Sequence, residues 1–243
     1  MTFSYENADE PAVKNISFTA EKGQTVAIIG STGCGKSTLL NLIPRFYDAQ
    51  EGQILIDGID HREYDLKALR DKIGFAAQKA VLFAGSVADN IAYGLDNATR
   101  EQVEHAARIA QAEEFILDKI GGYDSPIEQG GQNLSGGQKQ RLSIARAIIR
   151  CPEFYLFDDS FSALDFRTDL ELRRALAAET ENSTVLIVAQ RVSTIMHADQ
   201  ILVLERGELV GYGTHQELMR TCEIYREIVL SQLSEQEATQ NGR

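Results

Sequence analysis

The chain has 243 residues, of which 43% are apolar and 25% are charged, and its formal net charge at pH 7 is −12. This length and composition suffice for one large domain, or two lobes, around a hydrophobic core, which excludes a disordered or fibrous protein. Such an acidic chain is a poor match for nucleic acid, because a phosphate backbone is bound mainly through clustered lysines and arginines.

The cysteines and the apolar segments narrow the class of protein further. Cys34, Cys151 and Cys222 lie far apart, without the spacing of a zinc site, so we expect reduced thiols in a cytosolic protein. No apolar run approaches the ~20 residues that cross a bilayer, and no basic-then-apolar leader opens the chain. We therefore expect any membrane association to come through a partner or through a segment outside this chain.

Strand-like and helix-like segments alternate along the first part of the chain, which favours a mixed α/β fold. We predict, in order, a buried strand over 25–29, a helix over 36–43 that ends at Pro44, a strand over 53–56 and a strand over 73–77. The segment 53–56 alternates and ends in a turn, which is more typical of an antiparallel lobe.

The middle of the chain is predicted to form a helical lobe over about residues 85–149. Its first helical region, 86–120, contains Thr99 as a suitable N-cap, and a second long helix runs from Ser135 to Arg150. The core then resumes with strands over 154–157 and 185–189 and a helix over 168–178 between them. A final strand pair follows over 201–204 and 208–212, with a turn at Arg206 and Gly207. We assign residues 1–233 to one domain and residues 234–243 to a polar tail.

A glycine-rich loop lies between the first strand and the first helix. It consists of Gly30, Ser31, Thr32, Gly33, Cys34, Gly35, Lys36 and Ser37, and Thr38 follows in the helix. Such glycines let backbone N–H groups face phosphates, the lysine reaches the β- and γ-phosphate oxygens, and the serine can ligate Mg²⁺. A purely structural turn is the alternative, but the strand–loop–helix context favours nucleotide binding.

Two more segments carry matching chemistry. Asp158 ends the apolar strand 154–157, where a carboxylate can lie beside Mg²⁺ or, alternatively, only cap a helix. The segment 134–138 reads LSGGQ, in which Ser135 is a suitable N-cap and Gly136 and Gly137 expose N–H groups at a helix start. The fold cannot easily bring this segment to its own phosphate loop, so we expect it to serve a nucleotide that another subunit holds.

Together these segments resemble the nucleotide-binding domain of ABC transporters over nearly the whole chain. The loop 30–37 is similar to that family's Walker A motif, Asp158 to its Walker B acid, and Ser135, Gly136, Gly137 and Gln138 to its signature. Gln78 resembles the Q-loop residue, which the resemblance assigns to Mg²⁺ and catalysis, and Asp165 lies in a segment similar to the D-loop. Tyr5 resembles the aromatic residue that stacks on adenine, although an ordinary strand residue would also fit.

The resemblance implies a P-loop α/β core with an antiparallel β lobe and an α-helical lobe. It also implies a head-to-tail dimer with a second ABC ATPase subunit. Two ATP molecules with Mg²⁺ would then be bound, each between one chain's Walker A and the other chain's signature, and Asp165 would lie near the partner's nucleotide.

Three other segments, 45–48, 82–91 and 213–218, resemble exporters whose membrane helices precede the ATPase in one polypeptide. In such proteins the region 78–91 touches the membrane-spanning domain, which implies a place at the cytoplasmic face of a membrane. A soluble ABC-type ATPase acting on DNA or ribosomes is the alternative, but the sequence has none of the coiled-coil insertions, zinc modules or basic arms that those proteins usually carry.

The sequence departs from the family pattern at two positions. Asp159 stands where most members carry a catalytic glutamate, and a displacement of about 1 Å from the attack geometry can cost on the order of a hundredfold in rate. Gln190 stands where the family has the switch histidine; it can donate a hydrogen bond to a γ-phosphate but cannot become cationic.

Both departures fall in the same ATP site, while the signature is intact. The pair resembles the degenerate half of heterodimeric exporters, which binds ATP at a slow site and completes its partner's site. A homodimeric exporter that tolerates both substitutions, and a regulatory domain with almost no turnover, are the alternatives.

Overall fold

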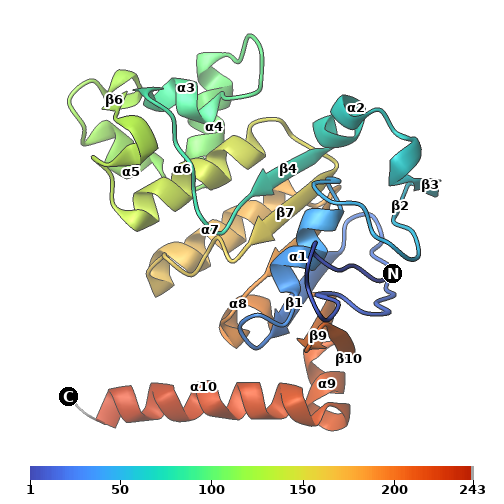
Figure 1. The fold of residues 1–243 in the computed structure, drawn as a ribbon. Coiled ribbons are helices and arrows are strands. Elements are labelled where there is room, and N and C mark those ends of the chain that lie inside the picture. The colour runs from blue at the N-terminus through green and yellow to red at the C-terminus, as the bar shows by residue number, and fades with distance from the viewer. Residues whose placement is uncertain (242–243) are drawn as a thin grey trace. The chain divides into compact units, whose positions relative to one another are not determined.

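The computed structural model describes residues 1–241, with side chains described as far as residue 232, and it divides into two compact units (Figure 1). Unit 1 consists of Met1–Arg70 and Leu186–Arg243, and unit 2 consists of Asp71–Val185. The chain therefore enters unit 2 once and returns from it through a strand, β8 (Thr184–Val188), whose first two residues belong to unit 2.

Unit 1 is built on a mainly parallel group of buried strands. β1 (Thr25–Gly30) pairs in parallel with β9 (Gln200–Glu205), and the end of β8 lies next to β1. β10 (Glu208–Gly213) returns antiparallel to β9 through the predicted turn at Arg206 and Gly207, which have φ angles of 47° and 80°. Continuous apolar runs in β1, β8 and β9 fit strands that are covered on both faces.

The helices of unit 1 follow these strands. They are α1 (Lys36–Leu42), α8 (Val192–Ile195), α9 (His215–Thr221) and the long α10 (Glu223–Asn241), together with most of α2 (Leu66–Asp71). The predicted tail 234–243 lies outside the residues whose side chains are described.

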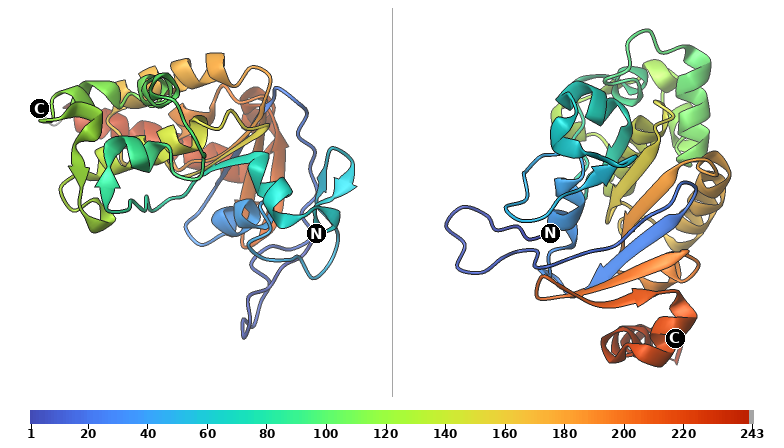
Figure 2. Two further views of the ribbon diagram at one scale, coloured as in Figure 1. Left: turned by 90° about the horizontal axis from the view of Figure 1, so that it is seen from above. Right: turned by 90° about the vertical axis from the view of Figure 1, so that its right-hand side faces the viewer.

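The rest of unit 1 is poor in regular structure. Figure 2 shows the first residues of the chain as a loop, in which an isolated bridge joins Phe3 to Val13, and a second bridge, between Thr2 and Glu51, joins the loop to the rest of the unit. The predicted strand over 53–56 pairs only at β2 (Leu55–Ile56), with β3 (Ile59–Asp60), before the short 3₁₀ turn η1 (His61–Glu63). These two strands are antiparallel, as the alternation predicted.

Unit 2 combines two parallel strands with a group of helices. β4 (Ile73–Ala76) pairs in parallel with β7 (Phe154–Asp158), and α7 (Phe166–Glu179) follows β7. The helices α3 (Val87–Ile91), α4 (Arg100–Ile109), α5 (Glu113–Leu117) and α6 (Gly136–Ile148) gather in one lobe (Figure 1). Short elements connect them: β5 (Gly85–Ser86), η2 (Gly122–Asp124), β6 (Pro126–Ile127) and η3 (Gln129–Gly131).

The helical region predicted over 86–120 is divided into three helices. Gly94, Asn97 and Gln111 have positive φ angles of 84°, 59° and 55°, and a right-handed helix cannot continue through such residues. The predicted caps are confirmed: the Thr99 side chain accepts the N–H of Gln102, and Ser135 caps α6 in the same way. Among the residues described, none of the helices has the length and apolar character needed to span a bilayer.

We predict that Thr99→Ala lowers the free energy of unfolding by about 1 kcal/mol, because it removes the acceptor of an N-terminal N–H group of α4. Thr99→Ser keeps that acceptor and should restore most of the loss. Urea denaturation of the three proteins measures the difference; an equal loss in the serine and alanine variants would contradict the capping role.

Candidate nucleotide-binding site

The loop between β1 and α1 is wound by glycines in the left-handed region. Gly30, Gly33 and Gly35 have φ angles of 154°, 81° and 99°. A Cβ at Gly30 would lie 2.1 Å from the carbonyl oxygen of Leu204, and one at Gly35 would lie 2.3 Å from that of Ala12. Other residues would therefore displace the loop at these two positions.

The Lys36 ammonium is held against the loop by the loop's own carbonyl groups. Its Nζ donates to the oxygens of Gly30 and Ser31 at 2.8 and 2.7 Å, and it lies 3.7 Å from the Sγ of Cys34. The first turn of α1 contains no acidic residue that would compete with an incoming anion. The loop thus presents a positive charge, three hydroxyl-bearing residues and a helix start, which together suit a phosphate group.

Tyr5 lies against the helix that follows the loop. Its hydroxyl group is 3.0 Å from the Oγ1 of Thr38, in the first turn of α1. Its ring contacts Phe3 and Tyr47 edge to face, with centroids 4.9 and 5.3 Å away, and the residue is 39% exposed. An exposed, oriented aromatic ring beside the phosphate loop suits a planar base.

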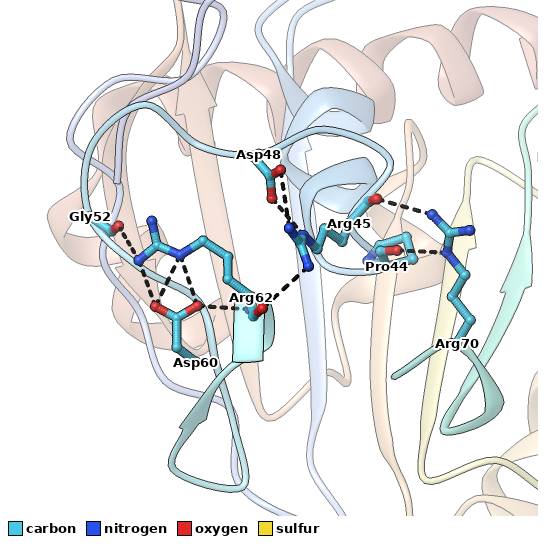
Figure 3. Close-up of polar contacts among 7 residues, drawn as sticks. All are labelled: Pro44, Arg45, Asp48, Gly52, Asp60, Arg62 and Arg70. Carbon is cyan, nitrogen blue, oxygen red and sulfur yellow. Dashed lines mark hydrogen bonds and ion pairs between the residues drawn. The ribbon is translucent and has the colours of Figure 1, made fainter. Parts of the chain in front are cut away.

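The far end of α1 is secured by arginines (Figure 3). Arg70 donates from Nε to the carbonyl oxygen of Pro44 and from Nη2 to that of Arg45, both at 3.1 Å. Arg45 in turn forms an ion pair with Asp48, with Nε 2.8 Å from Oδ1. Because α1 begins at the phosphate loop, these contacts also restrain the loop.

A second ion pair continues this network. Arg62 donates from Nη2 to the Oδ2 of Asp60 at 2.6 Å and from its backbone N–H to Oδ1 at 2.9 Å (Figure 3). These hydrogen bonds, first from the side chain and then from the backbone of Arg62, lower the pKa of Asp60 from 3.8 to about 2.

A second polar cluster lies in unit 2, after β7. Asp158 and Asp159 are each only 5% exposed, and Gln78 donates from Nε2 to the Oδ2 of Asp159 at 3.3 Å. Asp159 has a φ of 47°, a conformation that aspartate tolerates better than most side chains. The Oγ of Ser160 donates to the carbonyl oxygen of Ala76 at 2.7 Å, which ties this segment to β4.

The start of α6 is a third polar feature, also in unit 2. The Ser135 Oγ accepts the N–H of Gln138 at 3.2 Å, and the Gln138 Oε1 accepts the N–H of Ser135 at 3.0 Å. A Cβ at Gly136 would meet open space, so the backbone at this helix start is accessible. The arrangement is a capped helix N-terminus that can face an anion.

The matches to known proteins decide the family. The ABC transporter family matches residues 13–162, which is more than half of the chain. The chain belongs to the ABC transporter family.

Curated relatives of this ABC domain are ATP-binding proteins of transporters. It is 46% identical over 234 residues to an uncharacterized ABC transporter ATP-binding protein of Mycobacterium tuberculosis, and 47% identical over 232 residues to YfiB of Bacillus subtilis. These alignments cover 95% and 96% of the chain and 40% of each relative. A putative multidrug export ATP-binding/permease protein of Staphylococcus aureus is 46% identical over 219 residues, which cover 90% of the chain and 38% of that protein. The chain thus spans about two fifths of the length of these relatives.

A solved structure agrees with the fold. A bacterial Atm1-family ABC exporter with ATP bound superimposes with a TM-score of 0.92 at 40% identity, covering 96% of this chain and 41% of the exporter. The predicted α/β P-loop fold is therefore confirmed, and the chain is homologous to the ATP-binding domains of ABC exporters.

The predicted site residues of the ABC domain are divided between the two units. Tyr5, the Walker A loop and Gln190 lie in unit 1, whereas Gln78, the signature, Asp158, Asp159 and Asp165 lie in unit 2. Within unit 1, the N–H of Ala189 donates to the carbonyl oxygen of Ile28 at 3.2 Å. The next residue, Gln190, therefore lies near the end of β1, the strand that leads into the loop 30–37. Within unit 2, Asp165 caps α7, and hydrogen bonds from Thr168 lower the pKa of its carboxyl group.

A bound Mg²⁺ would need oxygen ligands. No group of three or more His, Cys, Asp and Glu side chains is placed to hold a metal in the described part of the chain. The predicted set of Ser37, Gln78 and Asp158 has one carboxylate and two neutral oxygens, which suits an ion that keeps several waters and takes further oxygens from phosphates. The chemistry of this donor set therefore fits Mg²⁺ bound together with a nucleotide.

Sequence reasoning missed Gln140, which supports the backbone of Gln78. Its side chain is only 4% exposed, and its Nε2 donates to the carbonyl oxygen of Gln78 at 3.0 Å. The helical spacing of the sequence could have indicated that Gln140 is buried, because positions 140, 144 and 147 of α6 lie on one buried face. A glutamine on such a face indicates a buried backbone contact.

We predict that Asp60→Asn destabilises the protein in a pH-dependent manner. The pKa of Asp60 is lowered on folding, so its stabilising effect is complete above about pH 4 and is lost as the pH falls toward 2. The melting temperature of the variant should be lower than wild type at pH 7, and the gap should narrow between pH 4 and pH 3. Asp9→Asn, at an exposed acid of the same unit, is the control. A gap that stays constant over this range would contradict the role of the ion pair.

Proposed function

We propose that the chain is the ATP-binding and ATP-hydrolysing motor domain of an ABC exporter. The observation that carries this proposal is the Lys36 ammonium, held against a glycine-wound loop at the start of α1, in a chain 40% identical to an exporter solved with ATP bound. The name of the Staphylococcus aureus relative, a putative multidrug export protein, supports export as the direction of transport. The transported substrate would be selected by the membrane-spanning domain.

Each site residue then has a defined role. Lys36, the loop glycines and the hydroxyl-bearing loop residues would bind the phosphates, and Tyr5 would stack on the base. Ser37, Gln78 and Asp158 would hold Mg²⁺, which neutralises phosphate charge when it is bound. Gln190 would donate to the γ-phosphate from the end of β8.

We assign residues 1–233 to the ABC ATPase domain, with its helical lobe over about 85–149, and residues 234–243 to a tail. The signature residues and Asp165 would act on a nucleotide held by a second ABC ATPase subunit in a head-to-tail dimer. Support comes from the accessible backbone at Gly136 and from Gly137, where an added Cβ would lie 3.2 Å from the carbonyl oxygen of Ala163, two residues before Asp165. Gly137 thus lies close to the segment that contains Asp165, within unit 2.

The segment 78–91 would contact the membrane-spanning domain at the cytoplasmic face. Phe83 and Tyr93 stack with centroids 4.5 Å apart, yet they remain 42% and 54% exposed. Arg146 lies over both rings and donates from Nε to the carbonyl oxygen of Asn90 at 2.8 Å. An exposed aromatic pair held this firmly is suited to docking against another protein surface.

The chain's own ATP site would hydrolyse slowly. Asp159 must position the attacking water with a carboxylate one methylene shorter than glutamate, and its Oδ2 already accepts a hydrogen bond from Gln78. Gln190 cannot carry the positive charge that an imidazolium would supply. Because the signature is intact, the chain would bind Mg-ATP at a slow site and complete a faster site on its partner, most simply in a heterodimer.

We predict that Asp159→Glu/Gln190→His raises turnover at this site by at least about tenfold, because it restores carboxylate reach and a titratable γ-phosphate contact. Mg-ATP hydrolysis should be measured over a range of protein concentrations in the complete transporter. In this transporter the catalytic carboxylate of the partner subunit should be replaced, so that only the site of this chain is measured. Lys36→Ala serves as the blank.

Slow wild-type turnover and fast, concentration-dependent turnover in the double variant would support the proposal. Brisk wild-type turnover would contradict the slow site and favour a homodimeric exporter. Co-purification with nucleic acid instead of a membrane domain would contradict export and favour a soluble ABC ATPase.

A further inference from the structure

One side-chain amide of α10 bonds to the backbone on both sides of Arg191. The Nε2 of Gln232 donates to the carbonyl oxygen of Gln190 at 2.7 Å, and its Oε1 accepts the N–H of Val192 at 2.8 Å. Both contacts lie within unit 1 and join residues about forty positions apart in the sequence. A glutamine amide can make both bonds at once because it carries a donor and an acceptor.

The second of these bonds satisfies an N–H group at the start of a helix that has no side-chain cap. Ser86, Thr99, Ser135 and Thr214 each cap their own helix through the side chain. By contrast, Arg191 at the N-cap of α8 makes no such bond. The N–H of Val192, the first residue of α8, is satisfied by Gln232 instead.

Gln232 extends from a helix that is itself anchored. Tyr225 and Val229 of α10 are 0% and 6% exposed, and the Tyr225 hydroxyl is 2.8 Å from the Nδ1 of His215 in α9. Tyr225, Val229 and Gln232 are spaced at i, i+4 and i+7, so they lie on one face of the helix. The amide therefore reaches residues 190–192 from a fixed support.

We propose that Gln232 is a positioning residue for the nucleotide site. By holding the backbone on both sides of residue 191, it fixes the direction from which the Gln190 side chain reaches a γ-phosphate. This inference rests on the proposed role of Gln190.

The first test needs no nucleotide. Gln232→Leu removes both hydrogen bonds, whereas Gln232→Glu keeps the acceptor for Val192 and loses the donor to Gln190. Leu230→Ala, at a 60% exposed residue of the same helix, is the matched control.

Hydrogen exchange of residues 190–195 should be measured in the complete nucleotide-free transporter. We expect exchange at Val192 to be about tenfold faster in Gln232→Leu and intermediate in Gln232→Glu, with no change in Leu230→Ala. Unchanged exchange in Gln232→Leu would show that the Gln232 hydrogen bonds do not hold residues 190–192, and would overturn the inference.

The second test separates positioning from mere helix docking. ATP and ADP affinities should be measured by displacement of a fluorescent nucleotide, in a transporter whose partner subunit has its Walker A lysine replaced. Gln190→Ala should weaken ATP binding by about tenfold and leave ADP within about twofold, because only ATP has the γ-phosphate. Gln232→Leu should show the same selective loss, and it should add nothing further in the Gln190→Ala background.

Each other outcome is decisive. Equal weakening of ATP and ADP by Gln232→Leu, or additive losses in the double variant, would show a structural role and overturn the inference. A selective loss in Gln190→Ala with none in Gln232→Leu would overturn the inference and leave the proposed function intact. No effect of Gln190→Ala would refute the γ-phosphate contact itself, and the inference with it.

Discussion

The glycine-rich loop depends on one close approach of backbone to backbone. The carbonyl oxygen of Leu204 lies 2.1 Å from where a Cβ of Gly30 would be, so the strand β1 can turn into the loop 30–37 beside β9 only with glycine there. Gly35 is constrained in the same way by Ala12. Between these two points the loop has little freedom, and Lys36 is bound by carbonyl groups that the turn brings together. The arginine contacts at the far end of α1 hold the same helix from the other side. The loop is thus preformed, which lowers the cost of ordering it when phosphate binds.

Neutral amides connect the functional segments of each unit. In unit 2, Gln140 supports the backbone of Gln78, and Gln78 donates to the carboxylate of Asp159. In unit 1, Gln232 supports the backbone of Gln190. An amide can fix the position of a neighbouring backbone or side chain, but it does not accept or release protons near neutral pH. These amides therefore position Gln78 and Gln190 and leave proton transfer from an attacking water to Asp159, which agrees with the slow turnover that we propose.

Local signals in the sequence were enough for much of the fold. The strand–loop–helix at the Walker A motif, the caps at Thr99 and Ser135 and the hairpin turn at Gly207 each depend on a few neighbouring residues, and all were predicted. The division of the 86–120 region was missed at both breaks. Gly94 and Asn97 are turn-favouring residues whose signal was overlooked, whereas Gln111 gives no sign in the sequence of its left-handed backbone. The amide contacts of Gln140 and Gln232 were missed for another reason: they join segments about sixty and forty residues apart, so only the folded chain shows them. The roles of the individual site residues remain predictions.

We propose that this chain retains intact Mg-ATP while its signature completes a faster site on the partner. The most direct measurement follows a photo-crosslinkable ATP, labelled on the α- or the γ-phosphate, in the complete transporter during steady turnover, with quenching and separation of the two subunits. We expect equal amounts of α and γ label on this chain and a deficit of γ label on the partner. A matching deficit of γ label on this chain would show that its own site hydrolyses as fast as the partner's, and would contradict the slow site.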